Sequence, residues 1–489
     1  MNRKSEKNKI LSGFLWKFVE RISSQGVSFV LSVILARLLM PEEYGLVAMI
    51  NIFIVFANVF VTSGFTSALI QKKDADDLDF STIFYCTLIM SFVMYGIIYV
   101  TSPYIAAFYR MPDLCLLTRV YALSLIITSY QTVQQAYISR HLLFKKTFVA
   151  TFFGTLLSGI IGVIMAYKGF GVWALVVQYI GNIVFNMFIL MLIIPWHPQL
   201  FFSWMRAKTL MDYGSKILAS SLVSAIYREI RQLIVGKVYS PGDLGMYNRG
   251  NNLPSLIYNN MDVAIRSVLF PAMSNYSDNP ERVMQMLRRG IKVSSYVTFF
   301  FLTLMATASE PLIRVLLTEK WIDSVPYMQV FCVSYMFLTI SNYNLEAIKA
   351  IGKGKEILKL EVFKKPVFLI VIIIAAHFSV LAVVLTSPFN SFYAMFMNMK
   401  PTRNYLDYSF KDQLADLLPA TLLAIALFLM TWPLTLLNWN DFIIMTLQII
   451  VGLCVYIGLS RVFKVESYEY VKNILVDVYI TKIKKRWQQ

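Results

Sequence analysis

Long apolar runs, separated by charged residues, proline or glycine, repeat along the whole chain of 489 residues. Most runs are about 20 residues long, which is the length that a helix needs to cross the hydrocarbon core of a bilayer. The pattern predicts about fourteen transmembrane helices. They are expected at residues 12–38, 45–70, 80–101, 114–138, 147–167, 172–194, 209–236, 244–272, 290–316, 325–348, 357–376, 379–399, 415–437 and 442–463.

Composition supports an all-α polytopic membrane protein. The chain is 57% hydrophobic and 15% charged, with a mean hydropathy of +0.60, which excludes an ordinary soluble domain. The connections are too short for a catalytic domain outside the bilayer, so a polymerase or glycosyltransferase is disfavoured and no enzyme activity is expected. The 4 cysteines stand singly, and with only 3 histidines no metal site or cofactor is expected. Residues 352–355 lack the spacing of a phosphate-binding loop, which argues against ATP hydrolysis.

The net charge of +17 is distributed unevenly between alternate connections. If the chain crosses fourteen times, 29 Lys and Arg fall on the side of the termini and only 4 on the other side, at Arg110, Lys168, Lys237 and Lys320. Cytoplasmic loops of membrane proteins carry the excess of basic residues. Both termini are therefore predicted to be cytoplasmic.

The chain contains an internal repeat. Residues 36–45 match residues 236–245 at an offset of 200, and two later matches follow at an offset of 208. The repeat predicts two six-helix bundles, residues 1–200 and 201–400, related by a pseudo-two-fold axis along the membrane normal. Residues 401–463 would add two helices, and residues 464–489 a basic amphipathic cytoplasmic tail. Such halves are typical of alternating-access transporters, although a duplicated scaffold without a transport role remains an alternative.

Twelve basic residues fall inside predicted spans, where charge is costly and usually functional. Two polar stripes, one on residues 12–38 and one on residues 209–236, are expected to face each other and form a cationic cavity. Arginine binds phosphate oxygens through paired donors, so the cavity predicts an anionic, phosphorylated substrate. The candidate substrate-binding residues are Lys17, Arg21, Lys216, Arg228, Arg231, Arg249 and Arg266.

Two structural roles compete with substrate binding for these charges. Residues near helix ends, such as Arg249, can extend to water, and neighbouring acids can form structural ion pairs with the arginines. The same acids are candidates for coupling transport to a proton or a sodium ion. These candidates are Glu20, Glu229 and Asp262, with Glu310 and Glu346 as weaker ones.

Several segments resemble the polysaccharide-exporter family typified by the colanic-acid flippase, over about residues 10–350. They are residues 16–21, 35–48, 64–65, 68–72, 140–145, 169–175, 245–249, 270–272 and 320–321. The resemblance implies the MATE-like fold of the multidrug, oligosaccharidyl-lipid and polysaccharide exporter superfamily. It also implies a bacterial inner-membrane flippase that moves undecaprenyl-pyrophosphate-linked oligosaccharide, an exopolysaccharide or O-antigen repeat unit, to the periplasmic leaflet. Membrane lipids are expected partners, and a polysaccharide polymerase and export machinery are candidate partners that the sequence does not specify.

Two related functions compete with this interpretation. A peptidoglycan-precursor lipid flippase would share the architecture and an anionic substrate. A cation-coupled multidrug antiporter of the same superfamily would need acidic and aromatic cavity residues, whereas the candidate cavity residues here are basic.

Overall fold

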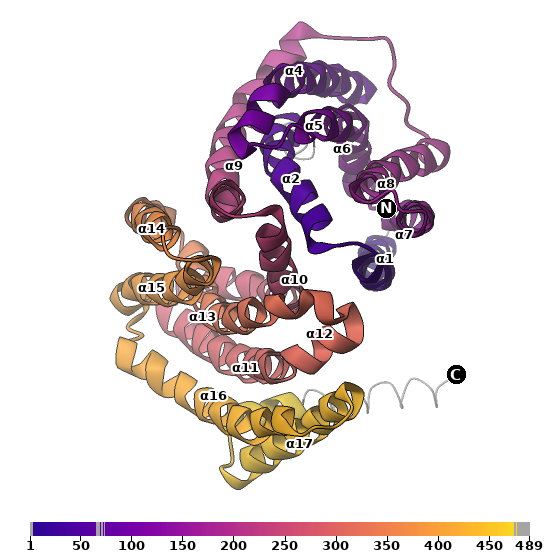
Figure 1. Ribbon diagram of the computed structural model, residues 1–489. Coiled ribbons are helices and arrows are strands. Elements are labelled where there is room, and N and C mark those ends of the chain that lie inside the picture. The colour runs from indigo at the N-terminus through magenta and orange to yellow at the C-terminus, as the bar shows by residue number, and fades with distance from the viewer. Residues whose placement is uncertain (1–2, 65–68, 70–71, 73, 474–475, 477–489) are drawn as a thin grey trace, which may run out of the picture. The chain divides into compact units, whose positions relative to one another are not determined.

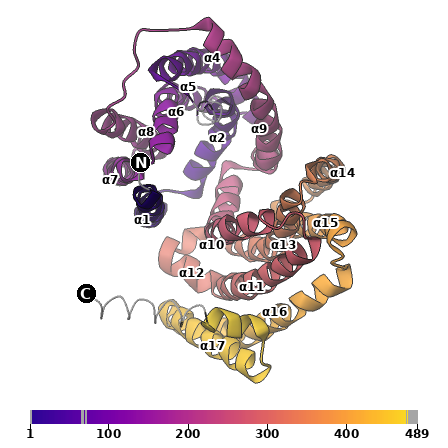
Figure 2. The ribbon, with the colours of Figure 1, turned by 180° about the vertical axis from the view of Figure 1, so that it is seen from behind.

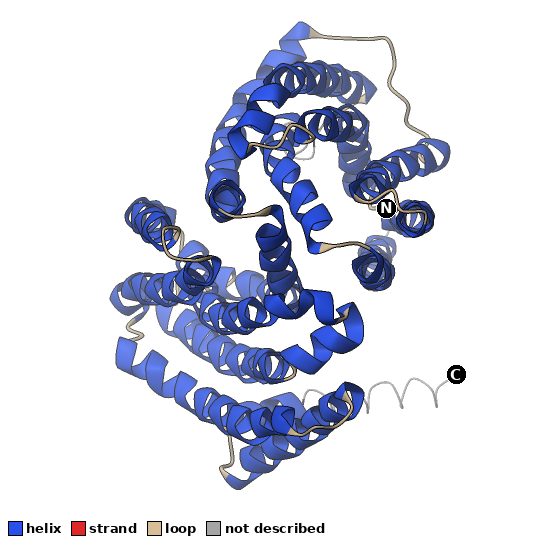
Figure 3. Cartoon of the chain, in the orientation of Figure 1, coloured by secondary structure: helices blue, strands red, loops and turns tan. Residues whose placement is uncertain are grey.

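The computed structural model is built of helices throughout the part of the chain that it describes (Figure 3). The backbone is described except at residues 1–2, 65–68, 70–71, 73, 474–475 and 477–489. The side chains of residues 3–15, 18, 212–213 and 216 are likewise outside the description. The chain forms two compact units, Met1–Gly245 and Met246–Gln489. The predicted repeat boundaries and the predicted cytoplasmic tail stay predictions, and most of the tail lies outside the described residues.

The first unit contains eight complete described helices and the start of a ninth. They are α1 (Arg3–Leu38), α2 (Pro41–Thr62), α4 (Asp77–Tyr109), α5 (Leu114–Ala122), α6 (Ser124–His141), α7 (Phe144–Tyr167), α8 (Val172–Ile193), α9 (Trp204–Val238) and the first residues of α10 (Pro241–Ser274). Within this unit α1, α7 and α8 lie side by side, and α9 runs along α2 and α4 (Figures 1 and 2). An extended connection joins α8 to α9, with Trp196 buried against Phe80.

The second unit continues α10 and adds seven α-helices and two short 3₁₀-helices. They are α11 (Pro280–Thr307), α12 (Ser309–Leu317), η1 (Glu319–Ser324), α13 (Val325–Ala350), α14 (Gly354–Ala375), α15 (Val380–Leu406), α16 (Phe410–Thr431), η2 (Trp432–Leu436) and α17 (Asp441–Val462). Within this unit α11 packs against α13 and α16, while α15 packs against α13 and α17 against α16. One core cluster of this unit joins residues of α10, α11, α13, α15 and α16.

Eleven helical segments of the described chain are long and apolar enough to cross a membrane. Many large apolar side chains on their outer faces are exposed, as Leu192 and Leu429 are, at 76% and 63%. Such extensive apolar exposure is costly in water and suits a lipid environment. The chain is therefore an all-α, multi-pass membrane protein, as predicted. The more polar helices α9, α10 and α14 have 35, 34 and 22 residues, and their role as further spans stays a prediction.

Two predicted helices are interrupted. The helix expected at 114–138 is divided at Leu123, where the Leu123 N–H bonds to the Val120 carbonyl in a tighter turn. The helix expected at 290–316 is divided at Ala308, where the Thr307 and Ser309 hydroxyls donate to the Leu304 and Ala306 carbonyls. Hydroxyls that bond to nearby carbonyls compete with the helical pattern, and hydropathy alone does not reveal such competition.

Candidate functional site

The predicted cations of α1 lie on the first turns of that helix whose side chains are described. The Lys17 side chain is exposed, and its Nζ lies 5.2 Å from the centre of the Phe144 ring on α7. Arg21 and the coupling candidate Glu20 are both half-buried. Because α1 packs mainly against α7, these residues lie along the α1–α7 contact of the first unit.

The C-terminal half of α9 carries a charged group with unequal exposure. Glu229 is buried, with 7% of its side chain exposed, whereas Arg228 is 66% exposed. Arg228 Nε donates to Glu229 Oε1 at 3.0 Å, and Gln232 Nε2 donates to Oε2 at 2.9 Å. The carboxylate is thus satisfied inside the protein while most of the Arg228 guanidinium remains available. Such an arrangement can offer paired donors to an anion.

Arg231 lies one turn from this group and is half-buried. Its Nε is buried without a hydrogen-bond partner among the described residues. A buried donor without an acceptor is costly, so this position favours an anionic ligand. The Lys216 side chain, predicted on the same stripe, lies outside the described residues. In the first unit α9 packs on α2 and α4, whereas α1 packs on α7. That the polar stripes of α1 and α9 face each other therefore stays a prediction.

A second charged group lies in the second unit, between α10 and α13. Arg266 Nη2 lies 2.6 Å from Glu346 Oε1, and Arg266 Nη1 lies 3.2 Å from Asp262 Oδ2. Lys349 Nζ lies 2.8 Å from Glu346 Oε1. Both acids are buried, at 9% and 7% side-chain exposure, and the cations are partly exposed. The spacing of four residues between Asp262 and Arg266 indicates such a pair, and the structure confirms it.

One buried oxygen of this group, Asp262 Oδ1, has no well-formed hydrogen bond among the described residues, although the Asn342 amide interacts with the Asp262 carboxyl. Nearby, Asn342 Nδ2 donates to the Tyr258 hydroxyl at 2.5 Å, and the Tyr258 ring stacks on Tyr335 with centroids 4.7 Å apart. A buried carboxylate oxygen that lacks a donor can accept a proton or a cation, so this position suits an exchangeable ion.

The structure separates Arg249 from this group. Arg249 is buried, and its guanidinium lies 4.9 Å from the centre of the buried Trp321 ring. Arg266 follows seventeen residues later on α10, which is about 25 Å along a helix. The two arginines, predicted for one cavity, therefore have different surroundings. Glu310 pairs with Arg314 on α12 and is also apart from the buried group.

The ends of α2 and α10 cross at very short range within the first unit. A Cβ atom on Gly45 would lie far less than 3.0 Å from the Pro241 carbonyl oxygen, and one on Gly245 would overlap the Pro41 carbonyl oxygen in the same way. Only glycine permits such an approach. The corresponding Pro-x-x-x-Gly positions of the repeat thus meet each other reciprocally.

The acidic residues of the same repeat cap these helices. Glu43 Oε2 accepts from the Met40 N–H at 2.7 Å, and Asp243 Oδ2 accepts from the Ser240 N–H at 3.1 Å. Each acid therefore fixes the chain entry just before the helix. The crossing explains the matched glycines and the capping explains the matched acids, and the sequence repeat alone revealed neither.

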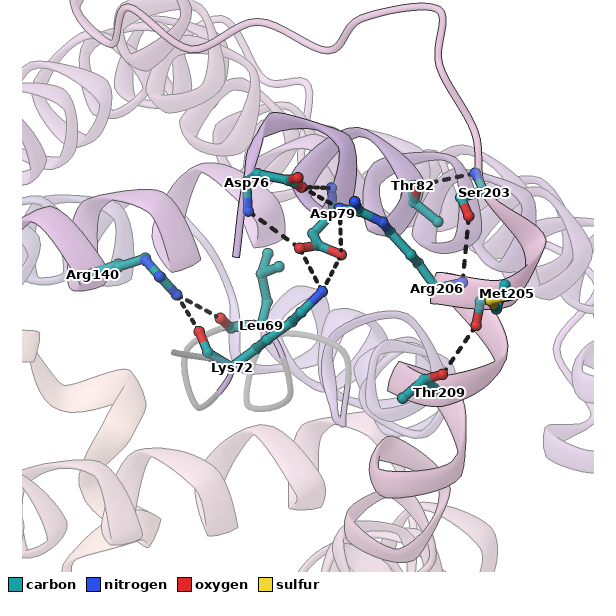
Figure 4. A network of polar contacts seen from close by, with 10 residues as sticks. All are labelled: Leu69, Lys72, Asp76, Asp79, Thr82, Arg140, Ser203, Met205, Arg206 and Thr209. Carbon is teal, nitrogen blue, oxygen red and sulfur yellow. Dashed lines mark hydrogen bonds and ion pairs between the residues drawn. The ribbon is translucent and has the colours of Figure 1, made fainter. Parts of the chain in front are cut away.

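A buried carboxylate organises the start of α4, as Figure 4 shows. Asp79 is fully buried and lies 2.6 Å and 2.7 Å from Lys72 Nζ through its two oxygens. Arg206, at the start of α9, lies 3.2 Å from Asp79 and also pairs with Asp76. Arg140, on α6, donates to the Lys72 carbonyl. The network ties together α4, α6, α9 and the connection before α4.

Asp76 remains ionised across neutral pH. The hydrogen bond from Arg206 holds the pKa of the Asp76 carboxyl well below its usual range, and the Asp79 N–H bond acts in the same direction. A carboxyl with a lowered folded-state pKa contributes stability above its unfolded pKa of about 4. That contribution is lost as the pH falls through the lower, folded-state value. The network is therefore expected to be complete at neutral pH.

Replacing Asp79 by alanine is expected to lower the free energy of unfolding by about 1–3 kcal/mol, because Lys72 and Arg206 lose a shared buried partner. Thermal unfolding of the purified protein in detergent measures this effect. Asp77→Ala is the matched control, since Asp77 is exposed on the same turn. Equal melting temperatures for the two variants would show that the network does not stabilise the fold.

Comparison with known proteins identifies a family and a relative that this chain resembles. A profile described as "Polysaccharide biosynthesis protein" matches residues 34–326, more than half of the chain. The succinoglycan biosynthesis transport protein ExoT of Rhizobium meliloti (strain 1021) is 24% identical over 339 residues, which are 69% of each chain.

Solved structures show the same fold. The lipid II flippase MurJ in an inward closed conformation has a TM-score of 0.73 at 15% identity, covering 93% of this chain and 98% of its own. An inward-facing MATE-family multidrug transporter of the MOP superfamily has a TM-score of 0.60 at 15% identity, covering 78% and 94%. These likenesses confirm the predicted MATE-like fold. The matching profile establishes that the chain belongs to the polysaccharide biosynthesis protein family, and the solved structures show that it has the fold of MurJ and of the MATE transporter.

Proposed function

We propose that this protein is a flippase that moves undecaprenyl-pyrophosphate-linked oligosaccharide from the cytoplasmic to the periplasmic leaflet of a bacterial inner membrane. The family and the transporter named among its relatives support lipid-linked oligosaccharide as the substrate class. One observation on α9 supports an anionic substrate. Arg228 is 66% exposed there, beside a Glu229 carboxylate whose oxygens already accept hydrogen bonds. A cation held in this way can replace water around a pyrophosphate in a low-dielectric surrounding.

The mechanism proposed is alternating access without covalent chemistry. Arg228 and Arg231 would bind the pyrophosphate, with Lys17, Arg21 and Lys216 adding positive charge to the predicted cavity. The crossing of α2 and α10 would close the pathway on one face, because its backbone contacts are too short to admit a substrate. Both termini would be cytoplasmic, the repeat would provide the two halves that move, and the protein would not be an enzyme.

A cell-based experiment tests this function. Cells depleted of the protein should accumulate lipid-linked oligosaccharide that an impermeant glycosidase cannot reach in intact spheroplasts. Restored expression should make it accessible. Accumulation of an accessible intermediate would instead place the defect after translocation, for example at the polymerase or export machinery, and would contradict the proposed role.

The ion that drives the cycle is proposed to bind at Asp262, beside Arg266 and Glu346. The support is the buried Asp262 Oδ1, for which no hydrogen bond is found among the described residues, beside the ion pairs of Arg266 with Asp262 and Glu346. Glu229 and Glu20 are the other candidates, but both Glu229 oxygens already accept hydrogen bonds. An acid that changes partners during the cycle could couple ion entry to a movement of α10 against α13.

Replacing Asp262 by asparagine is expected to make transport insensitive to an imposed ion gradient. The gradient-driven rate should fall at least about tenfold, which corresponds to a rise of about 1.4 kcal/mol in the free-energy barrier to transport. Transport with and without a proton or sodium gradient measures this. Glu356→Gln, which affects the exposed Glu356–Lys359 pair, is the control. A variant that melts earlier yet keeps full gradient dependence would reduce Asp262 to a structural ion-pair partner.

A further inference from the structure

Two adjoining cavities in the second unit share a wall. The first, of about 520 Å³, lies between α11, α16, α17 and the turn after α17. The second, also of about 520 Å³, lies along the first turns of α11. Lys292 and Glu466 line both. The cavities therefore meet at this pair, whose Nζ and Oε2 atoms are 2.7 Å apart.

The two cavities differ in chemistry. The first is lined mainly by apolar side chains, among them Leu418, Leu422, Ala426, Leu459 and Phe463. The second is lined by four cations and a single carboxylate, with residues Arg282, Arg288, Arg289, Lys292 and Glu466. An apolar chamber that continues into a basic one matches an amphiphile with an anionic head.

Two of the four cations are already neutralised by the protein. Arg288 Nε and Nη2 donate to the buried Asp416 at 2.6 Å and 2.9 Å. Lys292 lies 3.3 Å from Asp416 and is also paired with Glu466. The Tyr408 hydroxyl donates to the same Asp416 at 2.7 Å. These ion pairs lie where the two cavities meet.

The other two cations, Arg282 and Arg289, each lie over a tyrosine ring and have no carboxylate partner among the described residues. The Arg282 guanidinium lies 4.8 Å from the centre of the Tyr276 ring, and the Arg289 guanidinium lies 4.8 Å from that of Tyr470. Stacking on a ring fixes the plane of a guanidinium and leaves its N–H edge free. Two such edges beside one cavity suit a phosphate group.

The segment after α17, which lines the first cavity, is held in place by contacts within the protein. Ser467 Oγ donates to the Lys292 carbonyl at 3.1 Å, and Tyr468 is buried in a cluster with Tyr296 and Tyr456. Arg461 Nε donates to the Tyr468 hydroxyl at 2.7 Å. The segment that carries Tyr470 is thus held against α11 and α17.

We propose that these cavities bind one anionic phospholipid of the surrounding membrane, with its phosphate on Arg282 and Arg289 and an acyl chain in the apolar chamber. The site is separate from the α9 arginines and does not depend on the proposed flippase activity. The basic residues belong to a connection that the charge distribution places on the cytoplasmic side, where the leaflet is anionic. Charge complementarity therefore selects an anionic over a zwitterionic phospholipid.

Lipid binding to the purified, delipidated full chain tests the proposal. Thermal stabilisation is measured against added phosphatidylglycerol, phosphatidylcholine and undecaprenyl phosphate. Phosphatidylglycerol should bind at least tenfold more tightly than phosphatidylcholine. The Arg282→Gln/Arg289→Gln variant should lose this preference, and Ala426→Trp should weaken binding of long-chain but not short-chain phosphatidylglycerol.

Lys353→Ala is the matched control, since Lys353 is also stacked on a tyrosine, Tyr405, but lines neither cavity. It should bind like the native chain. Arg282→Lys/Arg289→Lys, which keeps the charge, provides a second variant if the glutamine variant unfolds, and it should show intermediate affinity. Equal affinity for the two phospholipids, or unchanged binding by the glutamine variant, would overturn the proposal. So would preferential displacement of phosphatidylglycerol by undecaprenyl phosphate, which would make the site one for the substrate tail.

Discussion

Replacing Arg228 or Arg231 by alanine is expected to reduce translocation of the lipid-linked oligosaccharide about tenfold to a hundredfold each. A charge-assisted hydrogen bond contributes about 1.5–3 kcal/mol, and each 1.4 kcal/mol is a factor of ten. Arg228 has the exposed guanidinium, and Arg231 has a buried Nε without a partner among the described residues. Initial rates in proteoliposomes of equal protein content measure the effect.

A double variant separates substrate binding from structural pairing at Arg228. Arg228→Ala takes one donor from the buried Glu229 and leaves the Gln232 amide in place, which could itself disturb α9. In Arg228→Ala/Glu229→Gln the carboxylate is gone, so a purely structural defect should be repaired. Transport that returns to the native rate would contradict a substrate-binding arginine. Arg314→Ala is the control, since Arg314 also pairs with nearby acids but lies outside the predicted cavity.

Replacing Gly45 by valine is expected to reduce translocation to below about a tenth of the native rate, because the α2–α10 crossing could no longer close. The Cβ position overlaps a backbone oxygen, whereas real Cβ contacts are essentially never under 3.0 Å. Backbone atoms cannot rotate away as a side chain can, so the two helix ends must separate. Transport rate and melting temperature, measured together, test this.

Gly245→Val should have a similar effect, since its contact with Pro41 is the counterpart of the Gly45 contact with Pro241. Gly96→Ala is the control, because a Cβ on Gly96, inside α4, meets no atom within 4 Å. It should leave transport unchanged. Native transport rates in both valine variants would show that the crossing does not have to close during the cycle.

Local features of the fold and site were predictable from the sequence. Hydropathy predicted the helices, and i,i+4 spacing indicated the Asp262–Arg266 pair, because both signals reside in neighbouring residues. The repeat predicted that residues 36–45 and 236–245 are equivalent. It could not predict that their glycines meet, because equivalence does not specify contact.

Long-range partners were not predictable. Arg266 meets Glu346 across eighty residues, and Lys72, Asp79 and Arg206 meet from three separate segments. In a single sequence nothing marks which of several acids a cation will reach. Charge counting also gave no sign that Arg249 is buried with its guanidinium 4.9 Å from the centre of the Trp321 ring, so its role in substrate binding stays a prediction.

The most direct test of the proposed function is translocation by the native chain alone. Purified protein is reconstituted into liposomes that contain undecaprenyl-pyrophosphate-linked oligosaccharide, and an impermeant glycosidase or lectin reports the lipid exposed on the outer leaflet over time, with and without an imposed ion gradient. Protein-containing vesicles should expose nearly all of the lipid-linked sugar, whereas protein-free vesicles and those with Arg228→Ala/Arg231→Ala should expose only the initial outer fraction. Equal exposure in all three, across several lipid-linked oligosaccharides, would contradict the proposed function.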